Sequence, residues 1–171
     1  MLSPLRSRAT DEDKQAQYAA VLRAVDALLE GEDDLIAAMA TVVAELHHAF
    51  EDFHWTGFYR VTAPELLVIG PYQGGHGCLR IPFARGVCGS AARTQTTQIV
   101  PDVEAFPGHI ACSSTTRSEI VVPVMTHGPS PRLVAVFDVD SDLPAAFTEA
   151  DRLGLLPLMQ RVGAIAAVRV S

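Results

Sequence analysis

The hydrophobic repeat of this chain changes its period near Phe53, and that change restricts the fold more than any other feature. Before Phe53, apolar residues recur every three or four positions over 11–30 and again from about Asp33. This spacing predicts two amphipathic helices. From Trp55 the pattern alternates with a period of two, which predicts a β-strand. The chain therefore combines helices with strands in one fold.

The predicted strands after this point are short, and residues such as glycine and proline separate them. We expect strands over 55–60, 66–69, 79–81, 97–100, 119–124 and 133–139. Residues 70–77 are expected to form a loop, and a short helix is expected over 87–94. This order, with hairpin-type links, predicts an α+β fold in which a central antiparallel sheet carries the terminal helices on one face and loops on the other.

The last helix is expected to begin at Thr148. Thr148 and Asp151 have the spacing of a capping box, in which two side chains bind the free backbone N–H groups of the first turn. Pro157 lies well inside this helix. Proline removes a backbone donor and clashes with the preceding turn, so we expect a kink there or two short helices.

Length and charge restrict the class of protein. The 171 residues fit one domain, which we place over 11–171 after a disordered segment over 1–10. The net charge of −7 opposes binding to phosphate backbones, so nucleic acid is not an expected partner. No apolar run approaches the roughly 18 residues of a membrane span, and no secretory signal is visible. We therefore expect a soluble, cytoplasmic protein.

The three cysteines are Cys78, Cys88 and Cys112, an odd number without a Cys-x-x-Cys spacing. We therefore do not expect a zinc ribbon, a thioredoxin-type motif or a disulfide scaffold. We expect reduced thiols. Cys88 falls in the first turn of the predicted short helix, where free backbone N–H groups favour a thiolate. Cys112 lies in a polar loop before a strand that begins near Ser118, a position that gives a reactive group access.

Three acidic residues lie at the ends of predicted strands. Glu119 begins one strand, while Asp138 and Asp140 alternate along another and so lie on one face of it. Two like charges on one face are unfavourable unless they serve a ligand. Thiols and carboxylates in one small domain indicate redox chemistry on a polar small molecule.

Seven blocks of sequence between Trp55 and Asp151 carry a family pattern. They are Trp55-x-Gly57-Phe58-Tyr59, Gly70-Pro71-Tyr72-Gln73-Gly74, Cys78-x-Arg80-Ile81, Gly86-Val87-Cys88-Gly89-x-Ala91-Ala92, Val100-Pro101-Asp102-Val103, Phe106-Pro107-Gly108-His109-Ile110-Ala111-Cys112 and Ser118-Glu119-Ile120-Val121-Val122-Pro123. Together they resemble the free methionine-(R)-sulfoxide reductases, which are stand-alone GAF-domain enzymes. The block that ends at Cys112 is far more specific than a general GAF pattern. The resemblance implies a GAF-like fold and reduction of free L-methionine-(R)-S-oxide to L-methionine.

The resemblance also implies roles for the thiols. Cys112 falls on the nucleophile position, and Cys78 and Cys88 fall on positions that resolve its sulfenic acid to a disulfide. Thioredoxin is the implied reductant, and a homodimer is the implied assembly. No bound cofactor and no metal is implied.

The implied substrate contacts come from acids, aromatic residues and one loop. Glu119 and Asp140 would handle the sulfoxide oxygen, and Asp138 would bind the ammonium group of the substrate. The other implied substrate-binding positions are Trp55, Tyr59, Ile110 and Ala111. A sulfoxide needs an acid at its oxygen, and two neighbouring carboxylates raise one another's pKa. The resemblance is therefore chemically consistent with the residues present.

Other functions are compatible with parts of this pattern. A GAF sensor module would bind a small ligand without converting it, and a thiol peroxidase would consume peroxide through Cys112. His76 and His109 with Cys78 and Cys112 offer the ligand types of a zinc site. Their spacing matches no standard zinc pattern, so no metal is expected.

Overall fold

The computed structural model describes residues 2–109 and 113–168. In this part the elements are α1 (Asp11–Leu28), α2 (Leu35–Ala49), β1 (Trp55–Ala63), β2 (Leu66–Gln73), β3 (Arg80–Pro82), α3 (Gly86–Thr94), β4 (Gln98–Val100), the 3₁₀-helix η1 (Val103–Ala105), β5 (Ser118–Met125), β6 (Leu133–Ser141) and α4 (Glu149–Val168). The predicted α+β class is confirmed. Among the described residues, no helix has the length and apolarity needed to cross a membrane.

The strands form one antiparallel sheet in the order β3-β2-β1-β6-β5-β4. β1 and β6 lie at its centre and pair over six residues, from Trp55 opposite Asp140 to Arg60 opposite Ala135. The two edge strands, β3 and β4, are only three residues long. Short edge strands offer little unpaired backbone to other chains. The long central strands are therefore the rigid part of the sheet.

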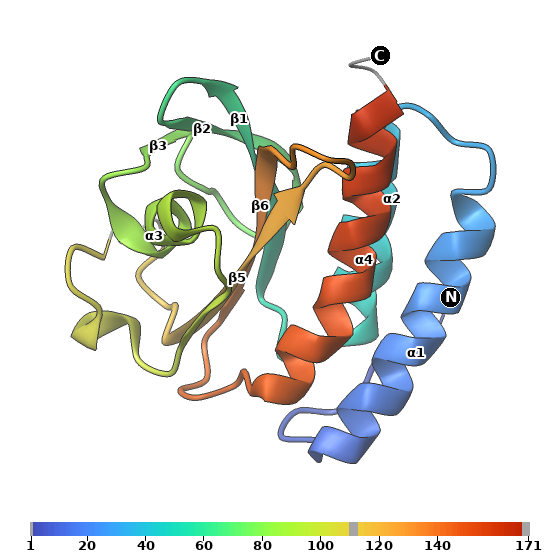
Figure 1. Cartoon of the computed structure of the whole chain (residues 1–171). Helices are drawn as coiled ribbons and strands as arrows, with labels where there is room; N and C mark the ends of the chain where they lie inside the picture. Colours follow the sequence, from blue (N-terminus) through green and yellow to red (C-terminus); the bar gives the residue numbers. More distant parts are fainter. Residues whose placement is uncertain (1, 110–112, 169–171) are drawn as a thin grey trace.

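Helices α2 and α4 cover one face of the sheet, α1 packs on the outer side of these two helices, and α3 lies against the other face (Figure 1). Because side chains alternate between the two faces of each strand, every strand contributes to the packing on both sides of the sheet. On β1, Phe58 joins the core under the three long helices, whereas Trp55 and Tyr59 face α3. On β6, Phe137 joins the first core. Asp138, the next residue, therefore lies on the α3 side of the sheet.

Helix α4 is one continuous helix through Pro157, so the expectation of two short helices is wrong. Leu153, four residues earlier, is 49% exposed, so this part of the helix faces solvent. The predicted capping box is present: Asp151 Oδ2 accepts from Thr148 N at 2.7 Å, and Thr148 Oγ1 accepts from Ala150 N at 3.2 Å. Packing of the apolar face of α4 on the sheet outweighs the local effect of the proline.

Contacts at Asp151 and at Gly163 hold α4 tightly in this layer. Lys14 on α1 and Asp151 form a buried ion pair, with Nζ 2.6 Å from Oδ2, and Tyr18 OH donates to Asp151 Oδ1 at 2.8 Å. Gly163 lies directly on the backbone of β5, because a Cβ there would be 2.0 Å from the carbonyl oxygen of Met125. The helical layer is therefore fixed at both halves of α4.

Two regions differ from the prediction. β2 continues through residues 70–73, which were predicted to be loop, because Tyr72 and Gln73 pair with Gly57 and Thr56 on β1. Residues 2–10 make defined contacts in place of the disordered segment predicted there: Leu5 forms an isolated parallel bridge with Phe50. The division into a lead-in over 1–10 and one domain over 11–171 stays a prediction.

Candidate active site

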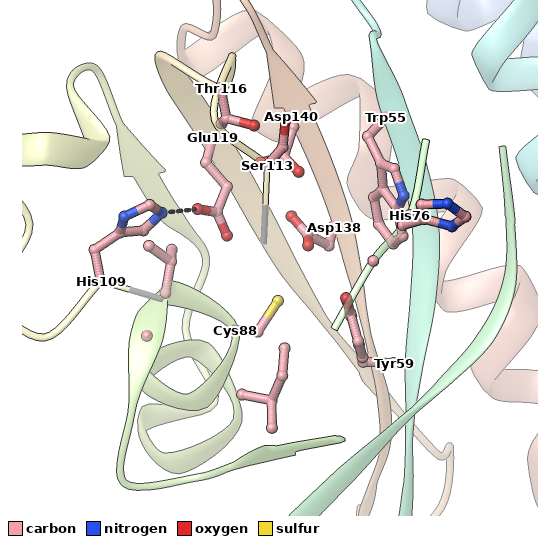
Figure 2. Close-up of a pocket in the computed structure, with 14 residues that line it drawn as sticks. Trp55, Tyr59, His76, Cys88, His109, Ser113, Thr116, Glu119, Asp138 and Asp140 are labelled. Atoms are coloured by element: carbon pink, nitrogen blue, oxygen red, sulfur yellow. Dashed lines mark ion pairs between the residues drawn. The ribbon is translucent and has the colours of Figure 1, made fainter. Parts of the chain in front are cut away.

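A small cavity lies between the central strands and α3, on the face of the sheet opposite the long helices (Figure 2). Its volume is about 40 Å³. The described residues that line it are Trp55, Tyr59, His76, Gly77, Ile81, Gly86, Val87, Cys88, His109, Ser113, Thr116, Glu119, Asp138 and Asp140. No lysine or arginine is among them, so the cavity carries acidic groups without a described cationic partner.

Strand register brings three carboxylates to this cavity. Glu119 on β5 pairs with Asp140 on β6, and Asp138 lies on the same face of β6 because it is two residues away. The side chains of Glu119 and Asp138 are nearly inaccessible, with 6% and 5% of their surface exposed. Asp138 Oδ1 is buried, and no described residue makes a hydrogen bond to it. Such an oxygen is costly to bury unless a ligand binds it.

Burial decides the ionisation of these acids. It is the main reason why the pKa values of Glu119 and Asp140 lie well above their ordinary range, and the charge of Asp138 adds to both shifts. Burial also raises the pKa of Asp138 to about 7, although hydrogen bonds from Cys88 and Glu119 lower it. Both of these neighbours donate to Asp138. Asp138 is therefore placed to hold the negative charge while Glu119 keeps its proton.

Cys88 lies in the first turn of α3 as predicted, but the expected thiolate is wrong. Only 3% of the residue is exposed. Burial raises its pKa, and the charges of Asp138 and Glu119 raise it further. These effects outweigh the free N–H groups of the helix start. Cys88 is a protonated donor to Asp138, not an activated nucleophile.

Aromatic side chains form one wall of the cavity. Trp55 stacks on Tyr59 and on Tyr72, with ring centroids 5.7 and 5.5 Å apart, and its Nε1 donates to Gly75 O at 3.2 Å. Gly57 makes this stacking possible, since a Cβ there would lie 2.5 Å from Tyr72 Cβ and 2.6 Å from the Trp55 ring. The wall is flat, apolar and held by two strands.

His109 contributes a further side chain that the sequence reading considered only as a zinc ligand. Its Nε2 lies 4.0 Å from Glu119 Oε2, and burial lowers its pKa, so the ring is neutral near neutral pH (Figure 2). His76 lies on the opposite side of the cavity in the same view. This separation argues against a zinc site shared by the two histidines. The position of His109, three residues before Cys112, was the available signal for a role in the site.

Comparison with known proteins gives the family. The sequence matches the GAF domain family over residues 34–170. It is 46% identical over 147 residues to GAF domain-containing protein A from Dictyostelium discoideum, covering 86% of this chain and 90% of that protein. It is 37% identical over 155 residues to free methionine-R-sulfoxide reductase from Escherichia coli, covering 91% and 92%. The X-ray structure of free methionine-R-sulfoxide reductase from Neisseria meningitidis in complex with its substrate is 38% identical, with a TM-score of 0.84 and 100% of both chains covered. The chain belongs to the free methionine-R-sulfoxide reductase family of GAF domains.

In this reductase-family chain, the cavity contains most of the predicted site residues that the structure describes. Five of the predicted residues that are described line the cavity together with Cys88: Trp55, Tyr59, Glu119, Asp138 and Asp140. Cys78 is half-buried and packs against the core on the α3 side. It is disulfide-bonded, so the expectation of a reduced thiol is wrong for this residue. Ile110, Ala111 and Cys112 lie outside the described residues. The loop that contains them leaves the described part at His109 and returns at Ser113, and both of these residues line the cavity.

Proposed function

We propose that this protein reduces free L-methionine-(R)-S-oxide to L-methionine, with the thiol of Cys112 as the nucleophile. The observation that carries the proposal is the meeting of Glu119, Asp138 and Asp140 in one buried cavity with an aromatic wall. Relatives named for this reaction, which share 37–38% of their residues with the chain, give independent support.

The acids suit the activation of a sulfoxide. Its sulfur accepts a nucleophile readily only when its oxygen is protonated as the S–O bond breaks. Glu119 is a protonated, buried acid at the cavity, and Asp140 lies opposite it on the paired strand. The thiolate of Cys112 attacks the sulfur, the oxygen passes to the cysteine, and the products are a sulfenic acid and methionine. Sulfur is reduced in the substrate and oxidised in the cysteine.

The charge distribution suits a free amino acid. Asp138 holds the negative charge in the cavity, and its Oδ1 has no described partner. The ammonium group of a free amino acid would satisfy that oxygen, while an amide nitrogen in a peptide has no charge to offer. Trp55 and Tyr59 would cover the side chain and methyl group of the substrate. Backbone N–H groups of residues 110–112 are proposed to bind its carboxylate.

A second thiol closes the cycle. The sulfenic acid condenses with a thiol to give a disulfide and water, and a thioredoxin-type dithiol then reduces the disulfide. We assign this resolving role mainly to Cys78, with Cys88 as a reserve. Two features support this order: Cys78 is disulfide-bonded, whereas Cys88 is a free and deeply buried thiol. The cycle needs no bound cofactor or metal. A homodimer and a cytoplasmic location stay predictions.

The test is turnover of the separate R and S isomers of free methionine sulfoxide, with a thioredoxin system and NADPH oxidation as the signal. We expect turnover of the R isomer only, and loss of at least about a hundredfold in Cys112→Ser. Cys88→Ser is the matched control and is expected to keep most of the activity. Binding of the sulfoxide without turnover would identify a sensor instead. Rapid peroxide consumption with no effect of sulfoxide would identify a peroxidase.

A further inference from the structure

We propose that the reduced protein binds one thiophilic divalent cation, such as Zn²⁺ or Cd²⁺, through Cys88, Glu119 and Asp138. The cation would occupy the space in which the proposed substrate places its ammonium group and oxygen. Metal binding and substrate binding would then exclude one another. The inference rests on the geometry of the described residues and does not require the reductase activity.

The three ligand atoms are already close together. Cys88 Sγ and one carboxylate oxygen each from Glu119 and Asp138 lie within 4.8 Å of one another, and all three residues are buried. Ligand atoms around a tetrahedral ion that is bound at 2.0–2.3 Å are about 3.5 Å apart. The atoms therefore need to approach one another by at most about 1.3 Å. Cadmium, which is larger than zinc, requires the smaller movement.

Rigid elements hold these ligands from three directions. Glu119 lies on β5 and Asp138 on β6, where Val121 pairs with Asp138 and Glu119 with Asp140. Cys88 approaches from the first turn of α3. A site built on strands and a helix loses little conformational entropy when a cation binds.

An unsatisfied oxygen points to a cationic ligand. Asp138 lines the cavity and is 95% inaccessible, and its buried Oδ1 has no hydrogen-bond partner among the described residues. No lysine or arginine is among the described lining residues, so no side-chain cation neutralises the acids. A divalent cation would satisfy the free oxygen, and the protons of Cys88 and Glu119 would be released to solvent when these groups bind it.

The donor set selects the class of metal. One thiolate with two carboxylates favours zinc and cadmium over magnesium and calcium, which prefer oxygen ligands alone. His109 lies beside this cluster, with its Nε2 4.0 Å from Glu119 Oε2, but it is not among the described groups whose ligand atoms lie within 4.8 Å of one another. A water molecule would complete four-coordination.

The test uses a Cys78→Ser/Cys112→Ser double variant, in which Cys88 is the only thiol. Cd²⁺ alone is the probe, titrated calorimetrically and by its thiolate-to-cadmium ultraviolet band in the absence of substrate. We expect one cation per chain, with no displacement by excess Mg²⁺. Adding Cys88→Ser should abolish the band. Adding Asp138→Asn or Glu119→Gln should weaken binding by at least about tenfold.

Glu104→Gln, which changes an exposed carboxylate paired with Arg117, is the matched control and should leave binding unchanged. Circular dichroism of every variant separates loss of a ligand from loss of the fold. Absence of a 1:1 complex in the folded double variant would overturn the proposal. Equal affinities for the parent, Asp138→Asn and Glu119→Gln would overturn it too, since the thiol would then be capturing cadmium without the carboxylates.

Discussion

Replacing Asp138 by asparagine should make the protein more stable at neutral and alkaline pH while it damages the site. The side chain is buried, has an oxygen without a partner, and carries the charge in a cavity without a described lysine or arginine. Asparagine has nearly the same shape and cannot ionise. The substitution therefore removes the cost of a buried charge and leaves the packing of β6 in place.

The size of the effect follows from the shift in pKa. Burial raises the pKa of Asp138 from 3.8 to about 7, so the folded state holds this proton over a range in which the unfolded state has lost it. Below the pKa of the unfolded state, Asp138 is protonated in both states, and the wild-type protein keeps its full stability. As the pH rises from there through the pKa of the folded state, the wild-type protein loses stability because ionisation favours the unfolded state. The difference corresponds to about 4 kcal/mol. The advantage of Asp138→Asn should thus be near zero at pH 4 and should grow to about 4 kcal/mol above pH 7.

Urea unfolding of reduced protein from pH 4 to pH 8 measures this difference. Trp55, the single tryptophan, is buried against Tyr59 and reports unfolding by fluorescence. Glu104→Gln is the control, because it removes an exposed carboxylate and should give a difference that does not vary with pH. A difference between Asp138→Asn and wild type that stays constant within about 1 kcal/mol would refute the reasoning on buried charge.

Three further substitutions test other parts of the structure. Glu119→Gln removes the proposed acid without changing its shape, so R-sulfoxide turnover should fall by about 10²–10⁴ with the fold retained, and a fall below threefold would contradict this role. Gly163→Ala forces a Cβ against β5 and should lower the free energy of unfolding in urea by about 1–3 kcal/mol. Leu153→Ala, on the exposed side of the same helix, is its control and should lower it by less than about 1 kcal/mol. Lys14→Met leaves Asp151 buried without its cation and should cost about 3–5 kcal/mol by the same measurement, and a cost near zero would show that the pair is screened.

The layer structure was predictable because it depends on periodicity. The change of period near Phe53 predicted the order of helices and strands, and alternation along β6 predicted that Asp138 and Asp140 share a face. The end of β2 was missed because Gly70 and Pro71 are usual loop residues. Their place in the strand comes from pairing with β1, a contact between segments that local propensity does not encode.

Ionisation in the cavity was predictable only in part. The sequence indicated that neighbouring carboxylates would raise one another's pKa, and Glu119 follows this expectation. It gave the wrong state for Cys88, because a helix start favours a thiolate only if the thiol is not buried beside acids. Burial arises when α3 packs against the sheet, so this competition is visible only in the tertiary structure.

The direction of the hydrogen bonds distinguishes Asp138 from Glu119. Cys88 and Glu119 both donate to Asp138, so the negative charge is most stable on Asp138 and the proton on Glu119. Residue type alone does not assign these roles, since aspartate and glutamate ionise alike in water. Pairing between β5 and β6 sets the distances between the carboxylates. The thiol on α3 donates to only one of them and so makes their surroundings different. In the proposed function, an ammonium group would therefore meet an anionic oxygen at Asp138, and the Glu119 proton, which Asp138 accepts in this structure, would be given to an oxygen acceptor on the ligand.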